Sequence, residues 1–143
     1  MKRLIIDTNA ICNVLSFEKP ELSTLREALL YGQRYRVCAV IGGRLSREYL
    51  VLRRYSATFA ELRRSGRLIA EKDEKVDQEQ RIVERNGGLR SDDPHIIALA
   101  RVGNVRILCS FDEDLHVDFK KKQFVDLPRG RIYLGNVHDH LLR

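Results

Sequence analysis

The stretch Leu4-Ile5-Ile6-Asp7-Thr8-Asn9 indicates the class of fold. Three apolar residues stop abruptly at three polar ones, which is typical of a buried parallel strand whose carboxyl end runs into a loop. In open α/β sheets, ligands bind at the carboxyl ends of the strands. Asp7 is therefore the first candidate site residue of this chain.

Three further stretches fit short buried strands. Residues 36–41 are closed by Gly42-Gly43, residues 106–109 run into polar residues, and residues 132–134 lie near the C-terminus. Periodic apolar positions and capping residues predict helices between these strands. The predicted helices cover residues 10–16, 21–31, 44–65, 72–85 and 94–101, and a terminal turn of helix is expected at 138–142.

Strands and helices thus alternate along the whole chain. This alternation predicts an α/β fold, a three-layer α/β/α sandwich with a mainly parallel central sheet of about four or five strands. Residues 1–143 are expected to form a single domain, because this length suffices for one hydrophobic core.

The composition excludes several other classes of protein. The chain is 43% hydrophobic and 32% charged, which fits a globular and not a disordered protein. Apolar runs such as residues 96–100 are far too short to cross a bilayer, so no membrane association is expected. Only three apolar residues separate Met1-Lys2-Arg3 from Asp7, too few for a secretory signal, so we expect a cytoplasmic protein.

The formal net charge of +6 is compatible with a polyanionic partner. Arg53, Arg54, Arg63 and Arg64 form the densest basic region. A surface that contacts RNA phosphates and a merely solvated helix face explain these four arginines about equally well.

Four carboxylates, those of Asp7, Glu48, Asp93 and Asp112, are expected to converge at one edge of the sheet. Asp7 and Asp112 follow predicted strands, whereas Glu48 and Asp93 lie early on predicted helices, whose amino ends point to the same edge. Clustered carboxylates raise one another's pKa and cost free energy, and a bound divalent cation is the usual reason for keeping them. Mg²⁺ and Mn²⁺ prefer such oxygen ligands and support phosphodiester hydrolysis.

Each of these residues also has a simpler structural explanation. Asp7 and Asp112 would serve as turn or N-cap residues, and Asp93 before Pro94 is a natural N-cap. Glu48 would be a solvated helix charge. Taken singly, these explanations are the stronger ones for every residue except Asp7. A shared site is therefore indicated only by the order and spacing of the four residues.

The order of four motifs resembles that of the PIN-domain family. Residues 5–9 resemble its opening motif, and residues 93–100, an aspartate followed by a buried Ile/Ala-rich helix, resemble its third. Residues 108–115 are similar to the fourth motif, a strand followed by Ser-x-Asp and a second acid. Residues 46–50 look like the second motif, which is the least specific of the four. Ser110 replaces the more common threonine, and Leu115 stands where an aromatic residue is frequent.

This resemblance implies a metal-dependent endoribonuclease that uses Mg²⁺ or Mn²⁺. Asp7, Glu48, Asp93 and Asp112 would hold the metal and act in catalysis. Glu61 is the alternative to Glu48. Three residues would support the site, Asn9 and Ser110 by hydrogen bonds and Asp114 as the second acid of the fourth motif.

The resemblance alone also implies partners. Many small prokaryotic members of the family look like the toxins of toxin–antitoxin pairs and form homodimers, so an RNA substrate, an antitoxin and a second copy are expected. The rival interpretation is a non-catalytic RNA- or protein-binding module with the same fold, against which the complete set of acids argues. An aspartate-based receiver domain is disfavoured because Asp7-x-Asn9 replaces Asp-x-Asp and no late lysine follows a strand. His95 lies beside the predicted site, where contact with substrate is one interpretation, and a position on the helix surface or partly packed is the favoured one.

Overall fold

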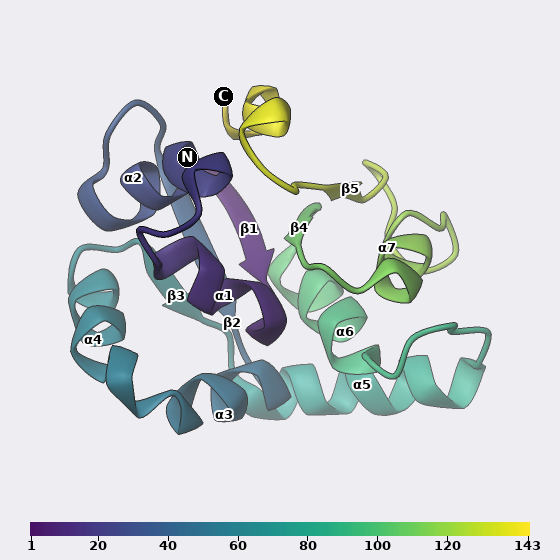
Figure 1. The fold of residues 1–143 in the computed structure, drawn as a ribbon. Coiled ribbons are helices and arrows are strands. Elements are labelled where there is room, and N and C mark those ends of the chain that lie inside the picture. Colours follow the sequence, from purple (N-terminus) through teal and green to yellow (C-terminus); the bar gives the residue numbers. More distant parts are fainter.

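Five parallel strands form one sheet in the order β3-β2-β1-β4-β5 (Figure 1). The computed structural model describes residues 1–143. Every strand pair is parallel, and this sheet confirms the predicted α/β class. The strands are β1 (Lys2–Ile6), β2 (Val37–Ile41), β3 (Leu68–Ala70), β4 (Ile107–Cys109) and β5 (Arg131–Ile132).

Helices cover both faces of the sheet and complete the three-layer α/β/α sandwich (Figure 1). Two layers form because the chain changes direction across the sheet. Strands β1, β2 and β3 follow one another toward one edge, and the connection after β3 then crosses back to β4 on the other side of β1. Since crossovers between parallel strands are right-handed, connections that run in opposite directions lie on opposite faces of the sheet. The α-helices are α1 (Thr8–Leu15), α2 (Ser23–Tyr31), α3 (Arg44–Val51), α4 (Ser56–Arg64), α5 (Asp73–Asn86), α6 (Pro94–Gly103) and α7 (Glu113–Phe119). Three 3₁₀ segments are η1 (Pro20–Leu22), η2 (Arg53–Tyr55) and η3 (Asn136–Leu142).

The core explains why the strands are short continuous apolar runs. All five residues of β2 and the last three of β1 are buried, as expected for central strands covered on both faces. Residues 95–100 of α6 are also all buried, so this helix lies within the core and not on its surface. In contrast, the highly charged α5 buries only Val76 and Val83, the thin apolar stripe expected from its sequence.

The structure differs from the predicted elements in three places. The single helix predicted over residues 44–65 is broken, because Leu52 leaves the helical conformation (φ −82°, ψ 66°) and η2 follows before α4 begins. The strand β3 was not predicted, because a three-residue edge strand is too short to show a period in the sequence. The last strand also lies at Arg131–Ile132, slightly before the predicted residues 132–134.

The register of the central strands positions the candidate site. Ile6 of β1 pairs with Cys109 of β4, so Asp7 and Ser110 leave neighbouring strands at the same level. The Asp7 amide donates to the Cys109 carbonyl at 2.9 Å, which extends the pairing to the first site residue. The buried Tyr49 hydroxyl donates to the Ile6 carbonyl at 2.6 Å and fastens α3 to the same strand end. None of the helices combines the length and apolar character needed to span a membrane.

Candidate metal centre

The carboxylate of Asp7 lies at the centre of the candidate site. Its side chain is 6% exposed, at the end of β1 and the N-cap position of α1. Oδ1 accepts a hydrogen bond from the Thr8 amide at 2.8 Å, and Oδ2 accepts one from the Ser110 hydroxyl at 3.0 Å. Burial raises the pKa of Asp7; these two bonds lower it in part, and the charges of Glu48 and Asp112 raise it again.

Ser110 and Asn9 form a hydrogen-bonded support behind Asp7. The Ser110 side chain is fully buried. Its oxygen accepts from the Asn9 side-chain amide at 3.3 Å and from the Asp112 backbone amide at 3.2 Å. The Asn9 carbonyl oxygen accepts from the Phe111 amide at 3.2 Å. Both residues thus link the loop after β4 to Asp7 by hydrogen bonds.

Glu48 reaches the same place from α3. Its Oε1 accepts a hydrogen bond from the Thr8 hydroxyl at 2.8 Å, and its Oε2 accepts one from Arg44 Nε at 3.3 Å. Thr8 therefore links the neighbouring acids Asp7 and Glu48, one through its amide and the other through its hydroxyl. Glu61, the alternative considered for this position, lies on α4, where it is 61% exposed and pairs with Arg64.

Asp93 occupies the N-cap position of α6, but its side chain caps no helix amide. The simple structural explanation for this residue therefore does not hold, and the carboxyl is free to face the site. The pKa of Asp93 is raised to about 7, first by burial and then by the negative charge of Asp7. Asp112 raises this pKa further, through a hydrogen bond and through its own charge. The nearby Arg44 guanidinium lowers it in part. The charges of both other aspartates thus act on the Asp93 carboxyl, which is not itself one of the three groups, Asp7, Glu48 and His95, whose ligand atoms lie within 4.8 Å of one another.

Asp112 combines a structural role with its place in the site. Its Oδ1 accepts hydrogen bonds from the amides of Asp114 at 3.0 Å and Leu115 at 3.3 Å, so the residue caps α7. The cap uses Oδ1 alone, and the side chain also contributes to the raised pKa values of Asp7 and Asp93. The N-cap explanation and the site explanation both apply to this residue.

His95 is the member of the site that sequence reasoning placed wrongly. It is 1% exposed and not on the helix surface, because α6 is buried on the side that carries it. Its Nε2 lies 3.5 Å from Glu48 Oε1, and ligand atoms of Asp7, Glu48 and His95 all lie within 4.8 Å of one another. The pKa of His95 is lowered to about 4, mainly by burial and also by the charges of Arg44 and Arg47, while Glu48 opposes these effects.

The remaining predicted residues lie outside this group. Asp114 is exposed and pairs with Arg90 at 3.5 Å. The four arginines lie on η2 and α4, which carry none of the acids of the site. Arg54 stacks on Tyr55, and Arg64 pairs with Glu61. The arginine at the site is Arg44, whose position four residues before Glu48 on a helix is the sequence signal that reveals it.

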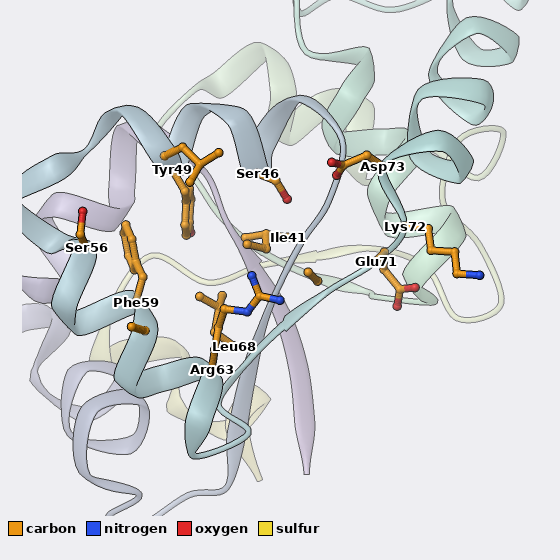
Figure 2. A pocket seen from close by; sticks show the side chains of 13 residues that line it. Ile41, Ser46, Tyr49, Ser56, Phe59, Arg63, Leu68, Glu71, Lys72 and Asp73 are labelled. Carbon is orange, nitrogen blue, oxygen red and sulfur yellow. The ribbon is translucent and has the colours of Figure 1, made fainter.

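An apolar cavity of about 550 Å³ lies apart from the carboxylates, between α3, α4 and β3 (Figure 2). The stacked rings of Tyr49 and Phe59 form one wall. Figure 2 shows Arg63 extending from α4 into this cavity, near Ile41 and Leu68. Arg63 thus extends into this cavity, which Glu71 and Asp73 also line, and not toward the acidic site.

The residues of the acidic site fit a divalent cation. Ligand atoms of Asp7, Glu48 and His95 lie within 4.8 Å of one another, Arg44 pairs with Glu48, and both nitrogens of the buried His95 ring lack a hydrogen-bond partner in the protein. Oxygen-rich sites with an imidazole are typical of Mn²⁺ and related ions. No protein-family model matches the chain, and no curated protein matches it. The function is therefore inferred from the site itself.

Proposed function

We propose that this chain is a metal-dependent endoribonuclease of the PIN-domain kind. The observation that carries the proposal is the cluster at the carboxyl edge of the sheet, where ligand atoms of Asp7, Glu48 and His95 lie within 4.8 Å of one another and the charges of Asp7 and Asp112 raise the pKa of Asp93. A non-catalytic domain gains nothing from this repulsion, since clustered carboxylates cost free energy without a cation.

The four carboxylates would hold one or two ions of Mg²⁺ or Mn²⁺. When bound, such a cation supplies positive charge that stabilises the transition state of phosphodiester hydrolysis and favours deprotonation of water. The residues themselves do the positioning. Ser110 orients Asp7 and Thr8 orients Glu48, each through its hydroxyl group. The Asp93 carboxyl, with a pKa of about 7, exchanges its proton near neutral pH when the metal binds.

Arg44 is the side chain best placed to bind a substrate phosphate. It is 46% exposed and lies beside Glu48, with its charge acting on both Asp93 and His95. A guanidinium at the rim of a metal site pairs well with phosphate oxygens. The net charge of +6 agrees with a polyanionic substrate. The choice of RNA over DNA comes from the motif resemblance, as do the antitoxin partner and the homodimer, which stay predictions.

The decisive experiment compares cleavage of end-labelled single-stranded RNA by matched variants in Mn²⁺ and in Mg²⁺. We expect Asp7→Asn and Glu48→Gln to lose at least about a hundredfold in rate while keeping the fold. Glu61→Gln, the same change outside the site, keeps the wild-type rate. Excess EDTA abolishes cleavage by the wild-type protein.

Two results would overturn the proposal. The first is cleavage by Asp7→Asn, or by the wild-type protein in EDTA, at the normal rate. The second is tight RNA binding without any metal-dependent cleavage, which is the behaviour of the non-catalytic module.

A further inference from the structure

His95 is a buried polar side chain that the protein leaves unpaired. It is 1% exposed, and neither Nδ1 nor Nε2 has a hydrogen-bond partner. Buried polar groups are almost always satisfied, because an unpaired one costs free energy on folding. A buried imidazole without a partner therefore requires a specific explanation.

The position of the ring supplies that explanation. Nε2 lies 3.5 Å from Glu48 Oε1, a long separation for a hydrogen bond, so Glu48 does not satisfy it. One ring nitrogen of His95 and one oxygen each of Asp7 and Glu48 lie within 4.8 Å of one another. Such separations suit three ligands of one ion, because oxygen and nitrogen ligands lie roughly 2.0–2.6 Å from a divalent metal.

The other two members of this triad are already oriented for the same purpose. The Ser110 hydroxyl fixes one oxygen of Asp7, and the Thr8 hydroxyl fixes one oxygen of Glu48. Partners that orient the ligands of a metal in this way are typical of real metal sites. His95 is fixed instead by its place on α6, whose residues 95–100 are all buried.

We propose that His95 is a nitrogen ligand of the cation held by Asp7 and Glu48, and that the site therefore prefers a first-row transition ion such as Mn²⁺ over Mg²⁺. Imidazole suits transition ions, whereas Mg²⁺ favours oxygen ligands and retains several waters. The inference rests on the proposed function and deepens it, because it names the ion that the nuclease site selects.

Binding of the metals alone tests this inference without reference to activity. Metal-free protein is titrated with Mn²⁺, followed by electron paramagnetic resonance of the free ion, and Mg²⁺ is then added as competitor. We expect the wild-type protein to bind Mn²⁺ at least about tenfold more tightly than Mg²⁺. His95→Leu loses about tenfold or more in Mn²⁺ affinity and less than about threefold in Mg²⁺ affinity.

Three additions make the test decisive. Pulsed resonance of Mn²⁺ bound to wild-type protein carrying ¹⁵N-histidine shows nitrogen coupling, a result that needs no folded variant. His95→Gln, a polar replacement, loses the same selectivity if His95→Leu does not fold. His140→Gln, a change at an exposed histidine near the C-terminus, keeps both affinities and the coupling.

The outcomes separate this inference from the proposed function. If Asp7→Asn abolishes Mn²⁺ binding but nitrogen coupling is absent and His95 variants keep the wild-type selectivity, the acidic metal site stands and His95 is no ligand. If Asp7→Asn binds Mn²⁺ like the wild-type protein, the proposed function itself fails.

Discussion

Asp93 and His95 lie two residues apart, and burial shifts their pKa values in opposite directions. The pKa of Asp93 is raised to about 7 and that of His95 is lowered to about 4, so both groups are neutral over much of the acidic range. In both cases burial favours the uncharged form. The metal-free site therefore contains fewer charges than its sequence suggests.

These two shifts predict opposite effects of pH on the stability of the metal-free protein. Between pH 3.8, the ordinary pKa of an aspartate, and about pH 7, Asp93 keeps its proton in the folded state and loses it in the unfolded state. Its contribution to the free energy of unfolding therefore falls as pH rises through this range. Between about pH 4 and pH 6.5, His95 is neutral in the folded state and gains a proton on unfolding. Its contribution to the free energy of unfolding therefore rises as pH rises through this range.

Thermal unfolding in EDTA, measured between about pH 4 and pH 7, separates the two groups. We expect the melting temperature of Asp93→Asn to rise with pH relative to that of the wild-type protein, because only the His95 effect remains. That of His95→Leu falls relative to the wild-type protein for the converse reason. Three parallel profiles would contradict the assignment.

At the level of elements, α7 positions the loop that carries Asp93. The carboxylate of Asp118, fully buried on α7, accepts hydrogen bonds from the amides of Arg90 at 2.9 Å and Ser91 at 2.9 Å. These bonds fix the backbone just before α6 begins. A residue remote in sequence thus determines where the Asp93 side chain enters the site.

Asp118→Asn removes the carboxylate charge and one of the accepting oxygens with almost no change in volume. We expect a loss of about 1–3 kcal/mol in the free energy of unfolding, since buried amides lose a charged acceptor. Mn²⁺ affinity falls as well, because Asp93 is no longer held in place. Urea unfolding and the Mn²⁺ titration measure the two effects, and unchanged values in both would show that α7 does not position Asp93.

The start of α3 depends on a glycine. Gly43 adopts φ +57°, and an added Cβ would lie 2.7 Å from Val76 Cγ1 of α5. Its amide also donates to Asp73 Oδ1 at 2.8 Å, which holds α3 against α5. Glu48 lies on the same helix, so we expect this close approach to affect the position of Glu48 as well.

Gly43→Ala and Gly66→Ala form a matched pair for this contact. Both glycines have positive φ, but nothing lies within 4 Å of a Cβ added at Gly66. We expect Gly66→Ala to cost about 1 kcal/mol for backbone conformation alone, and Gly43→Ala to cost about 1–3 kcal/mol more by overpacking. Chemical denaturation measures both, and equal losses would mean that α5 yields to the extra methyl group.

For the molecule as a whole, the acidic site and the densest basic cavity lie at different ends of the sheet. A second cavity of about 580 Å³ at the amino ends of the strands is lined by Lys2, Arg3, Arg106, Arg129 and Arg131. The acids and these bases thus lie at opposite ends of the sheet. Long-range attraction from the net charge of +6 would bring RNA to the surface, and Arg44 would then engage it at the metal site.

This arrangement predicts how salt weakens RNA binding. With Ca²⁺ in place of Mn²⁺, affinity for single-stranded RNA falls linearly on a logarithmic scale with salt concentration. Arg44→Gln reduces the slope by about 0.7, the value for one lost phosphate contact on a single strand. Arg64→Gln, at an arginine paired with Glu61, leaves the slope unchanged. Fluorescence anisotropy measures both slopes, and identical effects of the two variants would exclude a particular role for Arg44.

Local patterns in the sequence determined most of the fold. Short apolar runs that end in polar residues predicted β1, β2 and β4, and they located Asp7 and Asp112 at the carboxyl edge of a parallel sheet. These features follow from burial and from backbone direction, which neighbouring residues along the chain already define. The position of Asp93 at a helix start was also evident.

The tertiary structure alone decided the features that depend on packing between distant segments. β3 is an edge strand of three residues, and the chain breaks after α3 at Leu52 without a proline or glycine there, so that Phe59 of α4 stacks on Tyr49 of α3. Glu48 and Glu61 look alike in sequence, but only Glu48 meets Thr8. The burial of His95 beside Asp7 and Glu48 has no local signal in the sequence, because only folding brings these three side chains together.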